Sequence, residues 1–164
     1  MKNKLNIIDR LNNLIINKET DYAKNIYKNP VNEYTSPQRN LKEKEILFKD
    51  TPTCIGIASA IPNKGDWFTI QLVDTPILVV RKNTTDIVAF LNICTHRGAK
   101  IAKDKGNKAY SFKCPYHSWV YDLEGNLIGR PREKAFDEIP KKECNLKQLQ
   151  IHNHNGFLFI TINS

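Results

Sequence analysis

Cys94-Thr-His96 and Cys114-Pro-Tyr-His117 each place one thiol and one imidazole in a single short turn. The two stretches are separated by 17 residues and together form the pattern C-x-H-x17-C-x2-H. Two such turns that face each other can bind two metal ions with unlike ligands, thiolates on one ion and imidazoles on the other. The pattern therefore predicts a mixed sulfur and nitrogen centre built between two loops.

The Rieske [2Fe-2S] cluster has this ligand set, because two His replace two Cys on one of its irons. We expect Cys94 and Cys114 to bind the buried ferric iron, and His96 and His117 to bind the outer iron that accepts the electron. Two ferric ions, two sulfides and two thiolates sum to zero charge. A four-thiolate cluster is two units more negative and is harder to reduce. The four residues thus predict a chain that carries one electron at a time.

A structural zinc ion is the alternative for these four residues, because two Cys and two His also satisfy a tetrahedral site. Zinc sites of that kind usually pair like with like, as C-x2-4-C followed by H-x3-5-H. Each turn here mixes one Cys with one His. The mixed order favours the diiron centre.

Longer stretches around the two turns carry a family pattern. They are Cys94-Thr-His-Arg-Gly-Ala99 and Cys114-Pro-Tyr-His-Ser-Trp-Val-Tyr-Asp-Leu-Glu-Gly-Asn-Leu127, with shorter matches at Gly65-Asp66, Pro76-Ile-Leu-Val-Val-Arg81, Ala89-Phe-Leu-Asn92, Gly129-Arg-Pro131 and Gly156-Phe-Leu-Phe-Ile160. From about residue 30 onward, the chain resembles the large (alpha) subunit of Rieske non-haem iron ring-hydroxylating oxygenases. The resemblance implies that a catalytic domain with a mononuclear iron follows the Rieske domain in a full-length subunit and is absent from this chain.

Three positions distinguish the turns from Rieske proteins of the cytochrome bc type. Those proteins carry an extra Cys in each loop, joined in a disulfide, and a Ser two residues after the second His. Here the corresponding residues are Ala99, Tyr116 and Trp119. Because fewer hydrogen bonds would then reach the cluster sulfurs, we expect a potential low in the Rieske range, as in oxygenases. Ser118 stands where the oxygenases most often have Gly.

A helical arm is predicted over residues 1–50. Its first helix has an apolar face at helical spacing, formed by Leu5, Ile8, Leu11 and Ile15. A second short helix is predicted over residues 21–28, and a third from Ser36-Pro37 through Leu47, with Ser as N-cap and Pro in the first turn. The arm is expected to pack on the β domain, or alternatively on a neighbouring subunit or the catalytic domain.

From residue 51 to 164 the pattern changes to short β-branched runs divided by turn residues. The predicted strands are Cys54–Ala58, Trp67–Leu72, Ile77–Arg81, Ile87–Asn92, Gln148–His152 and Phe157–Thr161. They predict a mainly β fold, an antiparallel β-sandwich Rieske domain. A small cluster-binding subdomain is expected over about 92–121, with both ligand turns as hairpin tips and with Trp119 and Tyr121 shielding the cluster or packing in the core.

The remaining histidines and cysteines have less specific patterns. His152 and His154 are two apart in a predicted strand and share one face, but no carboxylate accompanies them. We expect them to face solvent rather than to form the mononuclear iron site. Cys54 and Cys144 are expected to be free buried thiols in a reducing cytosol rather than a disulfide.

The formal net charge of +8 is unevenly distributed. Between the two ligand turns, a single acidic residue, Asp104, opposes a basic rim formed by Arg97, Lys100, Lys103, Lys105, Lys108 and Lys113. Such a rim would attract an acidic electron donor, although a solvated Lys-rich loop is the alternative. Nucleic acid is a poorer explanation, because the basic residues are not interleaved with aromatics suited to base stacking.

The sequence contains no pattern of a membrane segment or a signal peptide. No apolar run approaches the length of a membrane span. Asp9 and Arg10 interrupt the opening apolar run before it reaches signal-peptide length. We therefore expect a cytoplasmic protein.

These observations predict the Rieske electron-transfer domain of a ring-hydroxylating oxygenase alpha subunit, an oxidoreductase component without its own oxygen-activating iron. By resemblance, a ferredoxin or flavin reductase reduces the cluster. An outer His then passes the electron to the mononuclear iron of the same or an adjacent subunit in a homotrimer. One alternative is a free-standing Rieske ferredoxin, which the helical arm and His96-Arg-Gly98 disfavour. The other is a zinc-bound structural or interaction domain. The substrate is not predicted, because its pocket lies in the catalytic domain.

Overall fold

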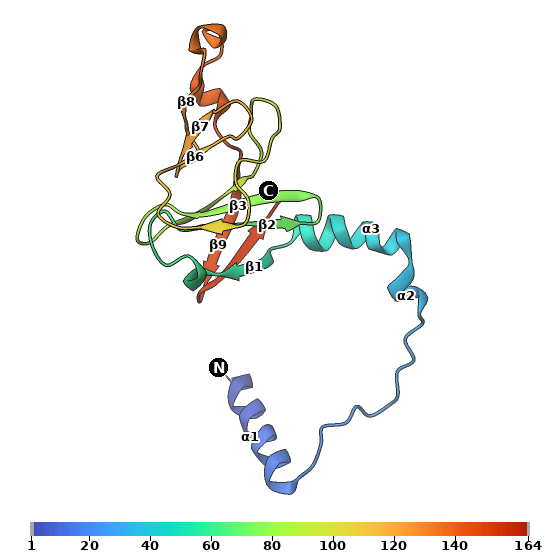
Figure 1. Cartoon of the computed structure of the whole chain (residues 1–164). Helices are drawn as coiled ribbons and strands as arrows, with labels where there is room; N and C mark the ends of the chain where they lie inside the picture. The colour runs from blue at the N-terminus through green and yellow to red at the C-terminus, as the bar shows by residue number, and fades with distance from the viewer. Residues whose placement is uncertain (1, 164) are drawn as a thin grey trace. The chain divides into compact units, whose positions relative to one another are not determined.

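The computed structural model describes residues 2–163, and it describes the side chains of the first helix from Asn6 onward. The chain divides into two compact units, Met1–Ser36 and Pro37–Ser164, which are described separately below (Figure 1). No helix within the described residues is both long enough and apolar enough to cross a bilayer.

The first unit contains helix α1 (Lys2–Asn17) and the short helix α2 (Asn32–Thr35), which are joined by a non-helical segment. The predicted first helix is confirmed. The side chain of Leu5, part of the predicted apolar face, lies outside the described side chains, and Leu14 is half-buried. The other apolar side chains of α1 are exposed, and Ile8 and Leu11 are each 55% exposed. The helix ends where Lys18 adopts the left-handed conformation, with a φ of 51°. Past this end, the Arg10 guanidinium donates a hydrogen bond to the Asp21 carboxylate.

The helix predicted over residues 21–28 is wrong, because no helix forms between α1 and α2. All eight of its residues are exposed. A helix of this length is marginal in water unless one face packs against another element. The expected helix has no such packing within its own unit.

Helix α3 (Pro37–Glu45) opens the second unit and continues as the π-helical turn η1 (Ile46–Asp50). The predicted start at Ser36-Pro37 is confirmed. The carbonyl of Lys49 in η1 accepts hydrogen bonds from the backbone N–H groups of Ile162 at 3.1 Å and Asn163 at 3.0 Å. This part of the predicted arm therefore packs on the β domain.

The second unit is built on a seven-stranded sheet in the order β1-β10-β9-β4-β3-β2-β5, and every neighbouring pair is antiparallel. Its strands are β1 (Thr53–Ile57), β2 (Trp67–Leu72), β3 (Thr75–Arg81), β4 (Ile87–Leu91), β5 (Lys105–Gly106), β9 (Gln148–His154) and β10 (Phe157–Thr161). All six predicted strands are confirmed, and the mainly antiparallel β fold is confirmed with them. β5 was not predicted.

The large sheet curls until β1 at one end meets β2, the strand next to the other end. A Cβ atom added to Gly56 in β1 would lie 3.3 Å from the Phe68 ring in β2, although four strands separate β1 from β2 in the sheet order. The curl closes a core that includes Ile55, Ile77, Val79, Leu158 and Ile160. Any side chain at position 56 would press on the Phe68 ring.

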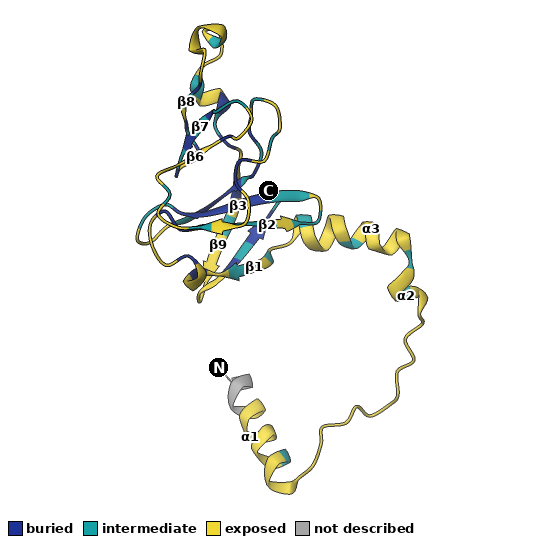
Figure 2. Ribbon diagram, in the orientation of Figure 1, coloured by how far each residue is buried: buried dark blue, intermediate teal, exposed yellow. Residues whose placement is uncertain are grey.

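The second unit also contains a separate three-stranded antiparallel sheet. It consists of β6 (Ser111–Lys113), β7 (Val120–Asp122) and β8 (Leu127–Gly129). Leu78 and Val80 of β3 belong to a core that also contains Cys94, Cys114 and Tyr121. Alternate residues of a strand point to opposite faces, so β3 separates this core from the one inside the curl. Figure 2 shows β3 largely buried and α3 largely exposed.

The expectation that both ligand turns are hairpin tips is correct for one turn only. The turn at Cys114 joins β6 to β7, which pair directly. The turn at Cys94 follows β4, whose sheet neighbours are β3 and β9, and precedes β5, which pairs with β2. The first turn is therefore part of a crossover loop, and it needs other contacts to hold its shape.

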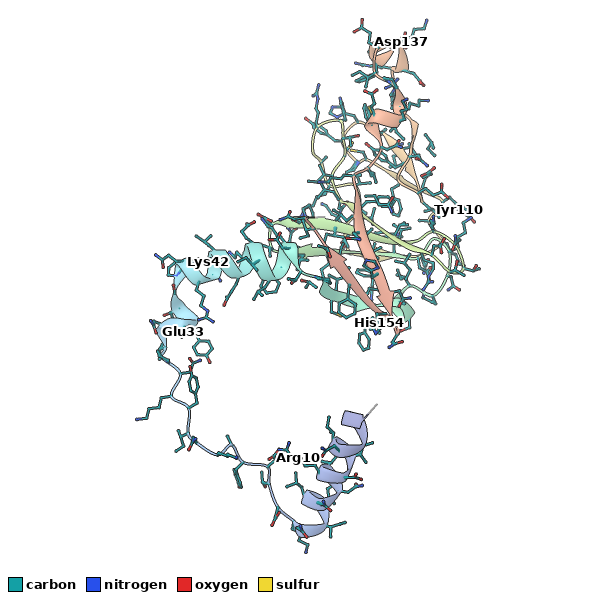
Figure 3. The ribbon with its side chains drawn as sticks, turned by 180° about the vertical axis from the view of Figure 1, so that it is seen from behind. Arg10, Glu33, Lys42, Tyr110, Asp137 and His154 are labelled. Carbon is teal, nitrogen blue, oxygen red and sulfur yellow. The ribbon has the colours of Figure 1, made fainter. Side chains whose placement is uncertain are left out.

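A loop with two 3-10 turns, η3 (Glu133–Phe136) and η4 (Lys141–Cys144), connects β8 to β9. Figure 3 shows Asp137 at the projecting end of this loop and His154 at the opposite end of the same unit. The loop starts directly after the small sheet that carries the second ligand turn.

Candidate metal centre

The first ligand turn is closed by two backbone hydrogen bonds around Cys94. The Cys94 N–H donates to the Ala99 carbonyl at 2.8 Å, and the Gly98 N–H donates to the Cys94 carbonyl at 2.9 Å. Gly98 has a φ of 76°, in the left-handed region that Gly adopts without strain. His96 thus lies inside a tight turn anchored at both ends.

The second ligand turn repeats this arrangement. The Cys114 N–H donates to the Trp119 carbonyl at 2.7 Å, and the Ser118 N–H donates to the Cys114 carbonyl at 3.0 Å. Ser118 has a φ of 60° and occupies the place that Gly98 has in the first turn. The two turns share one hydrogen-bond pattern, although the His is two residues after Cys94 and three after Cys114.

Asn92 fastens the crossover loop that carries the first turn. Its side chain is 2% exposed. The Oδ1 atom accepts hydrogen bonds from the N–H groups of Ile101 and Ala102, each at 3.1 Å, and the Nδ2 atom donates to the Ala102 carbonyl at 2.8 Å. The buried Asn92 side chain therefore connects the chain just before the first ligand turn to Ile101 and Ala102, just after it.

The two cysteines form the inner half of the site. Cys94 and Cys114 are each 2% exposed and belong to the core next to the small sheet. Burial raises the pKa of the Cys94 thiol, a hydrogen bond with Tyr121 opposes that rise, and the neighbouring Cys114 thiol adds to it. The thiols are thus close enough to interact, and they are shielded from water.

The two histidines form the outer half of the site. The ring centroids of His96 and His117 are 4.6 Å apart, with the rings at 75° to each other. Both residues are half-buried. Burial lowers the pKa of His96, and the nearby His117 and Arg97 lower it further. The lowered pKa favours the neutral imidazole, which is the form that binds metals.

The donor set fits a two-iron cluster better than a single metal ion. Within residues 2–163, no three side chains of His, Cys, Asp or Glu converge on one metal position. Two thiols in one pair and two imidazoles in another could supply two ligands to each of two irons, as a Rieske cluster requires. A zinc site of the same composition needs all four donors around one ion.

A model of the Rieske [2Fe-2S] domain family matches residues 51–150. The chain belongs to this family. The cofactor of the family is a Rieske-type [2Fe-2S] cluster, and the resemblance noted in the sequence is confirmed.

Similar proteins place this Rieske domain among oxygenase subunits. It is 35% identical over 127 residues to the biphenyl 2,3-dioxygenase subunit alpha of Rhodococcus jostii (strain RHA1), a match that covers 77% of this chain and 28% of that protein. It is 34% identical over 129 residues to the glycine betaine monooxygenase oxygenase subunit of Chromohalobacter salexigens, covering 79% and 29%. A solved structure of a quaternary ammonium Rieske monooxygenase superposes with a TM-score of 0.76 at 28% identity, covering 82% and 37%. The chain thus spans less than a third of the length of these curated relatives.

The hydroxyl of Tyr121 reaches the sulfur side of the Rieske site. It lies 3.3 Å from Cys94 Sγ and 3.0 Å from Thr95 Oγ1, and Tyr121 is fully buried. Thr95 Oγ1 donates in turn to the Cys144 carbonyl at 2.7 Å. Trp119 cannot replace the hydroxyl of the Ser found at this position in cytochrome bc-type Rieske proteins, but Tyr121 supplies a hydroxyl to the Cys94 sulfur from a different position.

Aromatic rings enclose His96 on two sides. The Trp119 ring stacks on it, with centroids 4.8 Å apart and planes at 8°, and the Phe136 ring meets it edge-on at 5.7 Å. Both proposed roles of Trp119 are compatible with this position, because it is buried in the core and covers a candidate ligand. Phe136 was not predicted, since it lies far from either ligand turn in the sequence. Its one signal is that it is a large apolar residue among charged neighbours.

The remaining Cys and His residues differ in their surroundings, and Cys144 alone of them belongs to the core that holds Cys94 and Cys114. His152 and His154 are exposed on β9, as expected. All four cysteines are free, Cys144 is buried and Cys54 is exposed. The prediction of a buried thiol at Cys54 is therefore wrong, because Cys54 lies in β1 at the edge of the large sheet, where one face is open to solvent.

The basic rim is on the surface of the Rieske domain. Every one of its six basic residues is exposed. Lys100 donates a hydrogen bond to Gln71 Oε1 at 3.3 Å, and no other side-chain hydrogen bond within the described residues holds a member of the rim. The six charges are therefore accessible to a partner.

Proposed function

We propose that this Rieske domain is the electron-transfer domain of an oxygenase alpha subunit and that it passes single electrons to a mononuclear non-haem iron. The separation of the donors supports this most directly, because the thiols are buried and the imidazoles lie nearer the surface. When bound, the cluster supplies a reversible one-electron couple. Cys94 and Cys114 hold one iron, and His96 and His117 hold the other at the side open to partners.

Metal analysis and electron paramagnetic resonance test the cluster assignment. We expect two irons and two sulfides per chain, and a paramagnetic signal that appears on reduction by one electron. A zinc-bound structural or interaction domain would be silent in both visible absorption and paramagnetic resonance. That result would replace the electron-carrier assignment with the zinc alternative.

The variant His117→Cys tests the ligand assignment. A third thiolate makes the cluster more negative, so the midpoint potential should fall, or the cluster should not form. His152→Cys, on the exposed face of β9, is the matched control and should leave the potential unchanged. An unchanged spectrum and potential in His117→Cys would remove His117 from the ligand set.

The electron acceptor is proposed to lie in a catalytic domain of the same or an adjacent subunit, within a homotrimer of the full-length protein. Inter-subunit electron transfer is described for the quaternary ammonium monooxygenase to which this chain is similar, which supports the adjacent subunit. Mixed oligomers of the parent protein provide the test, with cluster-free subunits combined with subunits whose mononuclear iron site is inactive. Recovered turnover supports transfer between subunits, and its absence supports transfer within one.

A free-standing Rieske ferredoxin is the competing assignment. The match to oxygenase subunits over more than three quarters of this chain favours the subunit assignment. Activity of this chain as a diffusing shuttle to a separate oxygenase would favour the ferredoxin. The donor to the cluster is proposed to be an acidic ferredoxin or a flavin reductase that docks on the basic rim.

Aromatic ring hydroxylation and a cytoplasmic location are further proposals. Similarity to the biphenyl dioxygenase subunit supports the aromatic substrate, whereas the glycine betaine subunit, at nearly the same identity, supports a quaternary ammonium compound. Substrate-dependent consumption of reduced nicotinamide by the parent enzyme with biphenyl or glycine betaine decides between them. Cell fractionation with an antibody to this chain tests the location.

A further inference from the structure

Residues 131–140, the outer part of the loop between β8 and β9, contact the Rieske site through the Phe136 side chain. Within residues 131–140 every residue is exposed except Phe136, which is half-buried. The Phe136 ring meets His96 edge-on at 5.7 Å and Trp119 edge-on at 5.4 Å. Because Trp119 also stacks on His96, the His96 imidazole lies between one aromatic face and one aromatic edge.

The other candidate ligand of the outer iron has a different environment. The His117 ring contacts the Tyr116 ring, with centroids 3.9 Å apart, and Tyr116 is 62% exposed. Neither Trp119 nor Phe136 makes a ring contact with His117 among the described residues. The loop therefore acts on His96 and leaves His117 open.

A buried arginine holds the loop in this position. Arg130 is 8% exposed, and its guanidinium donates to the Ile139 carbonyl at 2.8 Å and to the Phe136 carbonyl at 3.1 Å. The same guanidinium lies 5.4 Å from the Phe136 ring centroid. The planar Arg130 guanidinium binds the carbonyls of Phe136 and Ile139 and lies near the Phe136 ring. It therefore holds both the backbone and the side chain of Phe136 in place.

The remaining contacts of Arg130 are weak. Its Nε atom is the one buried side-chain nitrogen or oxygen without a hydrogen bond in the part of the chain that the structure describes, and it lies 3.9 Å from Glu133 Oε1. Glu133 is half exposed and binds Lys141 at 2.9 Å instead. A buried charge is costly without good partners, and the hydrogen-bond acceptors that the structure describes for this guanidinium are the two loop carbonyls.

We infer that Arg130 is a positioning residue that holds the ring of Phe136 against His96, so that the loop caps one of the two imidazole ligands. This inference rests on the proposed role of His96 as an iron ligand. The cap keeps water away from the bond between His96 and iron, and it limits rotation of the imidazole. The His117 side stays free for a partner.

The test uses the cluster-loaded full chain with the variants Arg130→Met, Phe136→Ala and their combination. Two quantities are measured: the rate at which an iron chelator removes the cluster, and the hyperfine coupling of the two histidine nitrogens after reduction. Each single variant should speed cluster loss by roughly threefold to tenfold, the range that matches one lost aromatic contact. Each should also change the coupling of one histidine nitrogen and leave the other unchanged. Because both residues act through the same contact, the double variant should be no faster than the single variants.

Two further variants separate positioning from charge. Arg130→Lys keeps the positive charge and loses the planar fork, so it should behave like Arg130→Met. Lys134→Ala changes the charge of the same loop without touching the cap, and it should match the wild type. If Arg130→Lys matches the wild type, or if the effects of Arg130→Met and Phe136→Ala add, the positioning role is overturned.

Failure of the inference differs from failure of the proposed function. A wild-type protein without any cluster signal overturns the proposed function and this inference with it. An intact cluster signal that neither Arg130→Met nor Phe136→Ala alters overturns the inference alone. Phe136→Ala removes one half-buried ring from a loop that is otherwise exposed, so the cap on His96 can be tested even if the Arg130 variants do not fold.

Discussion

The Tyr121 hydroxyl lies 3.3 Å from Cys94 Sγ, so its loss should change the reduction potential of the cluster. A hydrogen bond to a thiolate ligand is stronger after reduction, because the sulfur then carries more negative charge. Tyr121→Phe should lower the midpoint potential by roughly 40 mV, the equivalent of about 1 kcal/mol for one electron. Spectroscopic redox titration measures this shift. Tyr110→Phe, at an 89% exposed residue, is the control, and equal potentials for the two variants would show that Tyr121 does not tune the cluster.

The shared pattern of the two turns leads to a pair of opposite stability predictions. Ser118 adopts a positive φ at the position where the first turn has Gly98. Ser118→Gly should therefore raise the free energy of unfolding by roughly 0.5–1 kcal/mol, and Gly98→Ser should lower it by a similar amount. A Cβ atom at Gly98 meets no heavy atom within 4 Å, so the cost there comes from the backbone alone. Urea unfolding of the full chain gives both values, and shifts of the same sign would contradict the equivalence of the turns.

Single residues also show which parts of the site can be predicted from the sequence. The four candidate ligands could be found because each Cys and His pair is local, and a local pattern does not depend on the fold. The contacts of Phe136 and the hydroxyl of Thr95 depend on how the loop after β8 returns to the site, and no spacing rule expresses that. Cys54 was misplaced because an apolar strand can lie at the edge of a sheet as well as at its centre.

At the scale of elements, the crossover loop with the first turn depends on Asn92. Asn92→Ala would leave two backbone N–H groups and one carbonyl without their buried partner. The expected loss is about 2–4 kcal/mol of unfolding free energy, because unpaired buried polar groups keep their desolvation cost. Denaturant titration measures it, with Asn107→Ala at an exposed loop residue as the control. A change as small as that of the control would mean that the loop holds its shape without the amide.

Helices and strands could be predicted where the spacing of apolar residues matched the face that is buried in the fold. The six long strands have apolar runs that fit one or two buried faces, and the sequence located all of them. β5, β6, β7 and β8 are two or three residues long, too short to show an alternation. The helix expected over residues 21–28 had helix-compatible residues but no packing partner among the described residues of its own unit, and its propensity alone did not make it form.

At the scale of the whole molecule, the basic rim leads to a prediction about partners. Lys103→Glu combined with Lys105→Glu should slow reduction by an acidic ferredoxin roughly tenfold at low salt, because steering by surface charge controls the encounter rate. Added salt should reduce the difference, since screening weakens the attraction. Lys42→Glu combined with Lys44→Glu on α3 makes the same change in net charge away from the rim. Stopped-flow reduction compares the two pairs, and equal rates would exclude docking at the rim.

The alternation along β3 has a consequence for the order in which the protein is assembled. Ile77 and Val79 complete the core inside the curl without help from the ligand turns, while Leu78 and Val80 face the core that holds Cys94 and Cys114. The scaffold can thus be finished before iron and sulfide arrive. Amide hydrogens of β3 and β4 should exchange slowly with deuterated solvent even in newly made, iron-free chains, whereas those of the two turns should become protected only after cofactor delivery. A maturation factor would then meet a folded platform with two mobile loops rather than an unfolded chain.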